Sequence, residues 1–376
     1  MTVYLDHAAS TPMRSVAIDA MRPFLDDTYA NPAGAHRFAR RARKAVDEAR
    51  DEIAQLIGCD PGEVIFTGGG TEADNATILG AVRMHGGVAV CSAAEHHAVL
   101  HCVEHTRGPV VGTTATGSID LEHLERVLRD QSVDIAVVSV MAVNNEVGTI
   151  TPLRKVASLV REHRPNAILH CDAVQAACWL DLREISPLVD SIALSAHKFG
   201  GPKGVGVMTL RAGKNVEPLI LGGGQERDRR SGTHNVPGIV AAAAALRATD
   251  AERASEIARL GVLSRQLEQG IVERVGEATV TVPAEHRVPG VIHLCFSGVE
   301  SEALLFLLDE ANVCASAASA CASGAMSPSH VLTAMGLSNS LIRGALRMSI
   351  GHTTTQDDID RAIDAVSNAV LHLRAR

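Results

Sequence analysis

The chain has 376 residues, of which 46% are hydrophobic and 21% are charged, and its formal net charge is −8 at pH 7. These values are typical of a globular protein with room for one large domain and a smaller one. The negative charge argues against nucleic acid as a direct ligand, and the lack of a long apolar run argues against a membrane span. The N-terminus has no apolar signal region, so we expect a cytoplasmic protein.

Short apolar runs alternate with longer amphipathic segments in the first 215 residues, which predicts a mostly parallel sheet covered by helices. The expected strands are residues 63–67, 88–91, 135–140, 167–170, 191–195 and 205–210, and two expected helices are 120–129 and 153–162. The last strand follows a Gly-Pro-Lys-Gly turn too closely for a helical crossover, so we expect it to run antiparallel. An Ala-rich helix over 238–275 leads into a second domain, with strands at 291–296 and 345–350 and helices at 301–310 and 357–374.

A glycine-rich segment, Phe66-Thr-Gly-Gly-Gly-Thr-Glu-Ala-Asp-Asn75, follows the first of these strands and opens a helix. Its exposed backbone N–H groups and the helix start favour an anion. The segment lacks the ending of a Walker loop and the spacing of a dinucleotide loop, so a single phosphate monoester is the better ligand. A tight strand–helix turn without a ligand is the alternative.

Polar clusters follow several of the other strand ends. In chain order they supply an imidazole, amide donors, a carboxylate and a lysine, in Glu95-His-His97, Asn144-Asn145, His170-Cys-Asp172 and Ser195-Ala-His-Lys198. Each cluster alone has a structural interpretation, such as an Asx turn, a helix N-cap or a surface lysine. Together they match pyridoxal 5′-phosphate, which needs a phosphate cradle, a stacking group, a partner for the phenolic oxygen, a carboxylate at the ring nitrogen and a Schiff-base lysine. The eight cysteines form no Cys-x-x-Cys pair, so no metal site is expected.

With these motifs the chain resembles the cysteine desulfurases, which belong to the aminotransferase class V branch of the fold-type I pyridoxal phosphate enzymes. The resemblance extends from Tyr4-Leu-Asp-His-Ala-Ala-Ser-Thr-Pro12 to Arg347-Met-Ser-Ile-Gly351. Its other motifs are Asn31-Pro, 67–72, 95–96, 144–146, 172–175, 195–198, 222–227, 230–233 and 319–321. The resemblance implies an α/β fold with a large domain, built on a mostly parallel seven-stranded sheet flanked by helices, and a smaller α+β domain. The expected large domain is 15–255, and the small domain combines 1–14 with 256–376.

The resemblance also implies how pyridoxal 5′-phosphate is bound. Lys198 would carry the cofactor aldehyde, Asp172 would pair with the ring nitrogen, and His96 would stack on the ring and assist at the sulfur. The phenolic oxygen would lie between Asn145 and Gln175. The implied phosphate ligands are Gly70, Thr71, Ser195 and His197.

Substrate binding and the dimer follow from the same resemblance. Asn31 and Arg347 would hold the carboxylate of L-cysteine, and the planar fork of an arginine suits that task. Thr233 would reach the phosphate of the partner subunit, which implies a homodimer with shared active sites.

Cys321 lies in a segment of small residues, about 314–328, which we expect to be a mobile loop. By the resemblance, Cys321 attacks the substrate sulfur and then carries it as a persulfide to an acceptor protein, for iron–sulfur cluster assembly or for tRNA or cofactor thiolation. The competing thiol is Cys314, which follows the apolar Val313 and is expected at a strand edge. The chain stops at Arg376, without the longer tail of scaffold-binding relatives, which leaves the acceptor open. A selenocysteine lyase or other class V lyase, and a catalytically silent dimeric binding or regulatory protein, are the alternative functions.

Overall fold

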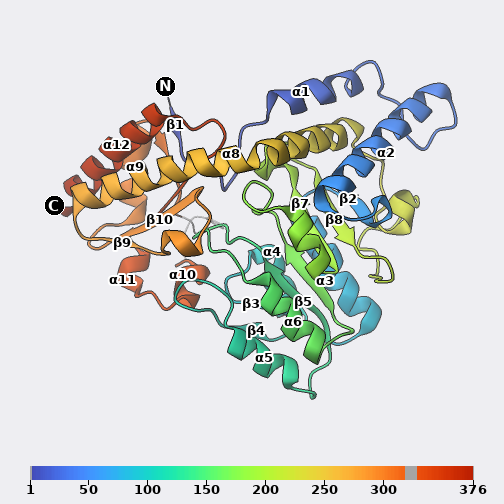
Figure 1. Cartoon of the computed structure of the whole chain (residues 1–376), viewed down its shortest axis with the longest axis horizontal. Coiled ribbons are helices and arrows are strands. Elements are labelled where there is room, and N and C mark those ends of the chain that lie inside the picture. The colour runs from blue at the N-terminus through green and yellow to red at the C-terminus, as the bar shows by residue number, and fades with distance from the viewer. Residues whose placement is uncertain (1, 318–327, 376) are drawn as a thin grey trace.

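The computed structural model describes residues 2–317 and 328–375, and its centre is a seven-stranded sheet (Figure 1). The strand order is β2 (Val64–Thr67), β8 (Gly206–Leu210), β7 (Ser191–Ser195), β6 (Ile168–Asp172), β5 (Ile135–Met141), β3 (Val88–Ser92) and β4 (Val110–Val111). The strands from β7 to β4 pair in parallel, whereas β8 pairs antiparallel with both β7 and β2. The predicted mostly parallel seven-stranded sheet and its antiparallel strand are therefore confirmed.

Helices cover both faces of this sheet, because its strands are apolar on both sides. One face packs against α2 (Arg37–Ile57), α5 (Leu121–Arg129), α6 (Leu153–His163), α7 (Leu182–Ile185) and the first part of α8 (Val236–Val275). The other face packs against α3 (Gly70–His85) and α4 (His97–His105). The α3 face receives Ile168 of β6, so by strand alternation it also receives His170 and Asp172.

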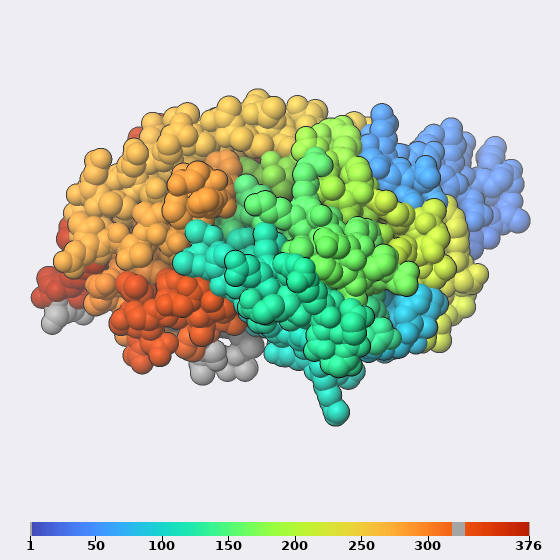
Figure 2. All heavy atoms as spheres, turned by 60° about the horizontal axis from the view of Figure 1, so that its bottom comes forward, coloured from blue at the N-terminus to red at the C-terminus, as the bar shows by residue number. Residues whose placement is uncertain are grey.

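A second core lies at the far end of α8, which is 40 residues long. It combines a three-stranded sheet, β12 (Ala345–Ser349), β10 (Val291–Phe296) and β9 (Ala278–Val280), with helices α9 (Ser301–Glu310) and α12 (Gln356–Arg374). The short helices α10 (His330–Ala334) and α11 (Asn339–Ile342) pack between this part and the large sheet, and Figure 2 shows their orange-red atoms beside the teal ones. The remaining short elements are α1 (Ser15–Met21) and the 3₁₀ turns 22–24, 61–63, 186–188, 196–198, 225–228 and 284–286.

The N-terminal segment returns to the large sheet from the second core. Its strand β1 (Val3–Tyr4) pairs in parallel with β11 (Val313–Cys314), and Val3 and Leu5 lie in the second core. The chain then crosses the carboxyl edge of the large sheet, where the Thr11 N–H donates to the carbonyl of His197 over 3.1 Å. Residues 6–11 thus lie over the strand ends that carry the predicted site. In the described part of the chain, no helix is long and apolar enough to cross a bilayer.

Candidate active site

Ten of the predicted residues line one pocket at the carboxyl edge of the sheet. They are Gly70, Thr71, His96, Asn145, Asp172, Gln175, Ser195, His197, Lys198 and Arg347. The pocket is also lined by Asp6, Ala8, Ala9 and Asp74, which the sequence analysis did not assign. Asn31 and Thr233 are not among its lining residues, and Cys321 lies outside the described residues.

Lys198 lies in the 3₁₀ turn that follows β7, and its ammonium group points to the N-terminal segment. Its Nζ donates to the carbonyl of Ala8 over 2.5 Å and to that of Ala9 over 2.9 Å. Burial lowers the pKa of Lys198 to about 8, the charge of Arg347 lowers it as well, and Asp172 opposes the shift. A lysine with such a pKa is a neutral amine in about one molecule in ten at pH 7, far more often than a lysine with the ordinary pKa of 10.5, and a nucleophilic lysine needs this form.

The anion end of the pocket is built where α3 begins. Gly70 is its first residue, and a Cβ at this position would lie 2.5 Å from Cγ2 of Val174, so only glycine fits there. The pocket continues here into a more open hollow that also borders Gly70, Thr71, Ser195 and His197. Burial lowers the pKa of His197 to about 4, and the nearby charge of Lys198 acts in the same direction. Backbone amides at a helix start, two hydroxyls and a neutral imidazole suit a phosphate monoester.

Asp172 and Gln175 lie deeper in the pocket. Oδ1 of Asp172 accepts a hydrogen bond from the Val174 N–H over 2.9 Å, and Nε2 of Gln175 donates to the Ala8 carbonyl over 2.6 Å. Burial raises the pKa of Asp172 to about 7, and the neighbouring Asp74 raises it further. A cationic group beside Asp172 would lower that pKa again, so this carboxyl favours a protonated nitrogen.

His96 is the N-cap of α4, where its Nδ1 accepts a hydrogen bond from the Ala98 N–H over 3.1 Å. This bond fixes Nδ1 as the acceptor, which leaves Nε2 to carry the proton of the neutral ring. Burial lowers the pKa of His96 to about 4, and the charge of Lys198 acts in the same direction. The ring is therefore neutral at pH 7 and is suited to stacking on a flat group in the pocket.

Arg347 reaches the pocket from β12 of the second core. Its Nη2 donates to Oδ1 of Asp6 over 2.7 Å, and its Nη1 donates to the carbonyl of Asn145 over 3.0 Å. Its buried Nε has no hydrogen-bond partner among the described residues. Each Nη atom keeps a second N–H, and Arg347 lines the pocket, so donor capacity remains for a carboxylate.

Hydrogen bonds connect the chain on both sides of the segment with Cys321 to pocket residues or to their sequence neighbours. Ser316 lines the pocket, and its backbone exchanges two hydrogen bonds with Arg347, of 3.1 and 2.7 Å. On the other side, Oγ of Ser329 donates to Oε2 of the buried Glu146 over 2.5 Å. The competing thiol, Cys314, has its pKa raised by burial and by the charge of Asp309.

Asn31 and Thr233 are exposed, and neither lines the pocket that contains Lys198. Oδ1 of Asn31 accepts from the Ala33 N–H over 3.0 Å, and Ala33 borders a hollow that is also lined by Glu226. Glu226 accepts two hydrogen bonds from Arg50, of 2.8 and 2.6 Å, one from the Phe66 N–H, and shares one with His234 at 2.6 Å. These bonds hold the backbone of Glu226 and of the next two residues at φ angles of 50°, 57° and 62°, a left-handed conformation that strains residues other than glycine.

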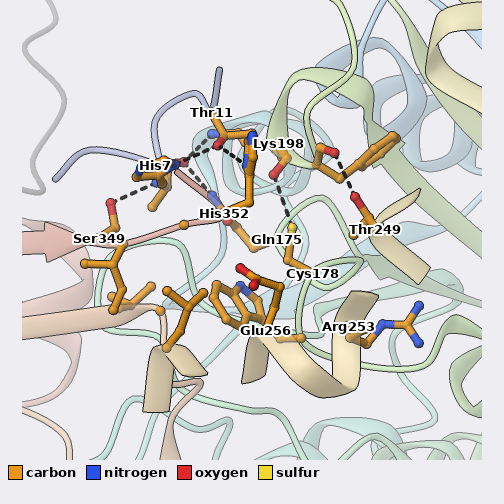
Figure 3. A pocket seen from close by; sticks show the side chains of 18 of the residues that line it. His7, Thr11, Gln175, Cys178, Lys198, Thr249, Arg253, Glu256, Ser349 and His352 are labelled. Carbon is orange, nitrogen blue, oxygen red and sulfur yellow. Dashed lines mark hydrogen bonds between the residues drawn. The ribbon is translucent and has the colours of Figure 1, made fainter. Parts of the chain in front are cut away.

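A second cavity lies behind Lys198, between the two parts of the molecule (Figure 3). His7, Thr11 and His352 form a hydrogen-bonded row on one side of it, with 2.6 Å between His7 and Thr11 and 3.4 Å between Thr11 and His352. Sγ of Cys178 points to the Lys198 carbonyl from another side, at 3.5 Å. Lys198 thus forms part of the wall between this cavity and the pocket.

The residues of the pocket fit pyridoxal 5′-phosphate. The structure places the anion end, the flat face of His96, the amine of Lys198 and the carboxyl of Asp172 around one space. No group of three or more His, Cys, Asp and Glu side chains in residues 2–317 and 328–375 is placed to hold a metal ion.

Comparison with known proteins gives one consistent result. The family model of the aminotransferase class V proteins matches residues 3–362. Over 99% of its length the chain is 37% identical to the cysteine desulfurase IscS of Dictyoglomus turgidum, of which it covers 95%. It is 39% identical, again over 99% of its length, to the IscS-like cysteine desulfurase of Mycobacterium tuberculosis, of which it covers 97%. A solved NifS-like protein aligns over 99% of this chain and 100% of its own, with a TM-score of 0.91 and 31% identity. The chain therefore belongs to the cysteine desulfurase family of the class V aminotransferases.

Proposed function

We propose that this protein is a cysteine desulfurase that uses pyridoxal 5′-phosphate, converts L-cysteine to L-alanine and retains the sulfur on Cys321. One observation carries the proposal: Lys198, Asp172 and Arg347 converge on one pocket in a member of this family. An amine of lowered pKa, a buried carboxyl and an arginine are the groups that an amino-acid reaction on an aldehyde cofactor requires.

The cofactor would be held by residues of the large sheet. Gly70, Thr71, Ser195 and His197 would bind its phosphate, His96 would stack on its ring, and Asn145 and Gln175 would flank its phenolic oxygen. Asp172 would face its ring nitrogen. When bound, pyridoxal 5′-phosphate supplies an aldehyde for an amine and a ring that withdraws electrons from the substrate's α-carbon.

The substrate would be oriented by Arg347, whose remaining Nη N–H groups would bind the cysteine carboxylate. Nζ of Lys198 is the base that we propose for the α-proton, because its lowered pKa leaves a lone pair on the nitrogen. His96 would hold or move a proton at the substrate sulfur through Nε2. Asn31 remains a predicted second ligand of the carboxylate.

Cys321 would take the sulfur as a thiolate. Its attack on the substrate Sγ forms the new S–S bond, the substrate C–S bond breaks, and the carbon takes up a proton, so that cysteine and a thiol give alanine and a persulfide. Cys321 follows Ser316, which lines the pocket, by five positions in the chain. An extended segment of that length spans at most about 17 Å, so Cys321 is within reach of the substrate.

The proposal extends to the assembly and the acceptor. We propose a cytoplasmic homodimer in which Thr233 completes the phosphate site of the partner subunit. We also propose the division into a large domain, 15–255, and a small domain, 1–14 with 256–376, which the two hydrophobic cores support. The persulfide sulfur would pass to an acceptor protein for iron–sulfur cluster assembly or for thiolation of tRNA or a cofactor.

The test is to supply the purified holoenzyme with L-cysteine and dithiothreitol and to measure alanine and sulfide. Equal amounts of the two products are expected, with the substrate consumed in the same amount. Turnover of L-selenocysteine with rejection of L-cysteine would indicate a selenocysteine lyase instead. No turnover of either amino acid by cofactor-loaded protein would contradict the proposal and favour a silent binding protein.

A further inference from the structure

Two carboxyl groups, and not one, face the pocket at its deep end. Asp74 lines the pocket together with Asp172, and its side chain is almost fully buried, at 1% exposure. It comes from α3, which packs on the sheet face that carries His170 and Asp172 of β6. Among the described residues, no lysine or arginine forms an ion pair with Asp74.

The partner of Asp74 is an imidazole that is itself sealed from solvent. Oδ1 of Asp74 lies 3.1 Å from Nε2 of His170, and Nδ1 of His170 lies 3.2 Å from Oγ of Ser191. The row ends at Thr77, whose Oγ1 lies 3.0 Å from that hydroxyl. One proton must lie between Asp74 and His170, either on the carboxyl or on the imidazole.

The surroundings of the pair decide where that proton lies. Asp172 and Glu95 are further buried carboxyls near Asp74, and Oε2 of Glu95 has no hydrogen-bond partner among the described residues. Three neighbouring carboxylates cannot all remain charged in a buried space with one lysine close by. Burial raises the pKa of Asp74 to about 8, which favours the proton on the carboxyl. Burial lowers the pKa of His170 to about 4, so the ring is neutral, and with its proton on Nδ1 toward Ser191 its Nε2 can accept the hydrogen bond from Asp74.

We propose that Asp74 is a neutral acid that donates its proton in a hydrogen bond to His170, so that Asp172 is the single negative charge beneath the cofactor ring. Asp74 and His170 are then positioning residues: they hold the strand that carries Asp172 and keep a second charge out of the pocket. The inference rests on the proposed function only in assuming that Asp172 faces the ring nitrogen.

Infrared spectroscopy of the holoenzyme labelled with [4-¹³C]aspartate tests where the proton lies. At pH 7 the wild type should show the C=O stretch of a protonated aspartic acid, and Asp74→Asn should lose it. The isotope label separates this band from that of Glu95, which is buried in the same region. The matched control is Asp190→Asn: Asp190 is also buried but is paired with both Nη atoms of Arg161 at 2.9 Å, so its removal should leave the band unchanged. A band of undiminished intensity in Asp74→Asn would overturn the proposal.

The wild-type holoenzyme gives a second test, the pH dependence of the infrared band, which does not require any variant to fold. The same band should fade as the pH rises, with a midpoint near 8. Besides His170, the titratable groups that face Asp74 are Asp172 and Cys171 on β6, Glu95 after β3 and Cys102 on α4. Of these, only Asp172 contributes to an aspartate-specific band, and the Asp74→Asn spectrum isolates its share. A wild-type spectrum without the band at pH 7 would overturn the proposal.

Cofactor affinity measures the functional consequence without any cysteine turnover. Asn at position 74 can donate an amide N–H to His170 as the neutral acid does, so Asp74→Asn apoprotein should bind pyridoxal 5′-phosphate with a Kd within about twofold of the wild type. Asp172→Asn should raise the Kd at least about tenfold, because it removes a charge that the bound cofactor needs. An Asp74→Asn protein that binds as weakly as Asp172→Asn would show that Asp74 acts as an anion. A failed desulfurase assay with intact cofactor binding would count against the proposed function alone.

Discussion

Arg347 and Asp6 form an ion pair inside the pocket, with 2.7 Å between Nη2 and Oδ1. The two residues are 341 positions apart in the chain, and they come from β12 and from the segment after β1. Asp6 holds the guanidinium in place but also neutralises part of its charge. The affinity of the pocket for a carboxylate is therefore a balance between these two effects.

Substitutions of Arg347 and Asp6 should show whether Asp6 affects carboxylate binding mainly by positioning the guanidinium or mainly by neutralising its charge. Arg347→Lys should raise the KM for L-cysteine by about tenfold or more, because an ammonium group cannot form a two-point bond to a carboxylate. Asp6→Asn keeps an oxygen acceptor for Nη2 but removes the charge, so it should lower KM by about twofold to fivefold. Steady-state kinetics of both variants check this. A rise of KM in Asp6→Asn would mean that the positioning of the guanidinium by Asp6 matters more than the neutralisation of its charge.

The lowered pKa of Lys198 predicts how cofactor capture depends on pH. Only the neutral amine attacks the cofactor aldehyde, so the rate at which apoprotein takes up pyridoxal 5′-phosphate should rise with pH, with a midpoint near 8 and not near 10.5. Stopped-flow absorbance between pH 6.5 and 9.5 measures it. Lys198→Ala should abolish covalent capture, whereas variants of Lys203, an exposed lysine on the adjoining hollow, should keep the midpoint. A midpoint above 10 would contradict the environment described for Lys198.

Cys321 can be tested against Cys314 as its matched control. Cys321→Ser should keep the absorbance of the bound cofactor but reduce alanine and sulfide formation to background, because the serine hydroxyl does not accept sulfur. Cys314→Ser should retain most of the activity, because burial raises the pKa of this thiol and disfavours the thiolate. Mass spectrometry of cysteine-treated enzyme should find the additional sulfur on Cys321. Wild-type turnover by Cys321→Ser would remove this residue from the mechanism.

Glu226 should matter for stability, because it compensates the buried charge of Arg50. Burial alone would raise its pKa, but hydrogen bonds from His234 and then Arg50 outweigh this and lower it to about 2. Glu226→Gln should cost about 3–5 kcal/mol in the free energy of unfolding, since it leaves Arg50 buried without its counter-charge. In the more exposed pair of Glu72 and Arg230, Glu72→Gln should cost no more than about 1 kcal/mol.

The lowered pKa of Glu226 also predicts that the free energy of unfolding falls at acidic pH. Its folded pKa of about 2 lies below the ordinary value of 4.5. The ionised form therefore stabilises the fold above about pH 4.5, and this contribution is lost as the pH falls toward 2. Urea denaturation of wild type and Glu226→Gln at about pH 7 and about pH 3 checks both effects. An equal loss of stability in both proteins between these pH values would contradict the role given to Glu226.

The sequence was sufficient to predict the strands whose ends carry the proposed cofactor-binding residues. Buried parallel strands are nearly continuous apolar runs, so the ends of β5, β6 and β7 were recognisable, and with them Asn145, Asp172 and Lys198. Strands of two or three residues, such as β4 and β9, were not predicted, because they are too short for a hydrophobic pattern.

Two further members of the pocket could not be found from local patterns. Asp6 and Ala8 enter it only because β1 pairs with β11, a contact between the two ends of the chain that no local signal reveals. Asp74 was visible in the glycine-rich motif, but its burial depends on how α3 packs on β6. The exposed positions of Asn31 and Thr233 leave their predicted roles to a test in the proposed dimer.

The path of the N-terminal segment sets the order in which the site can form during synthesis. Residues 3–8 are made before the strands of the large sheet, but their partners, Val313 and Ser349, are made after all of them. Until then the carbonyl of Ala8 has no fixed position, and the ammonium group of Lys198 lacks its acceptor. A nascent chain that already contains the whole large sheet therefore still has an unfinished pocket. The protein can assume its functional form only after the chain has been translated beyond Ser349.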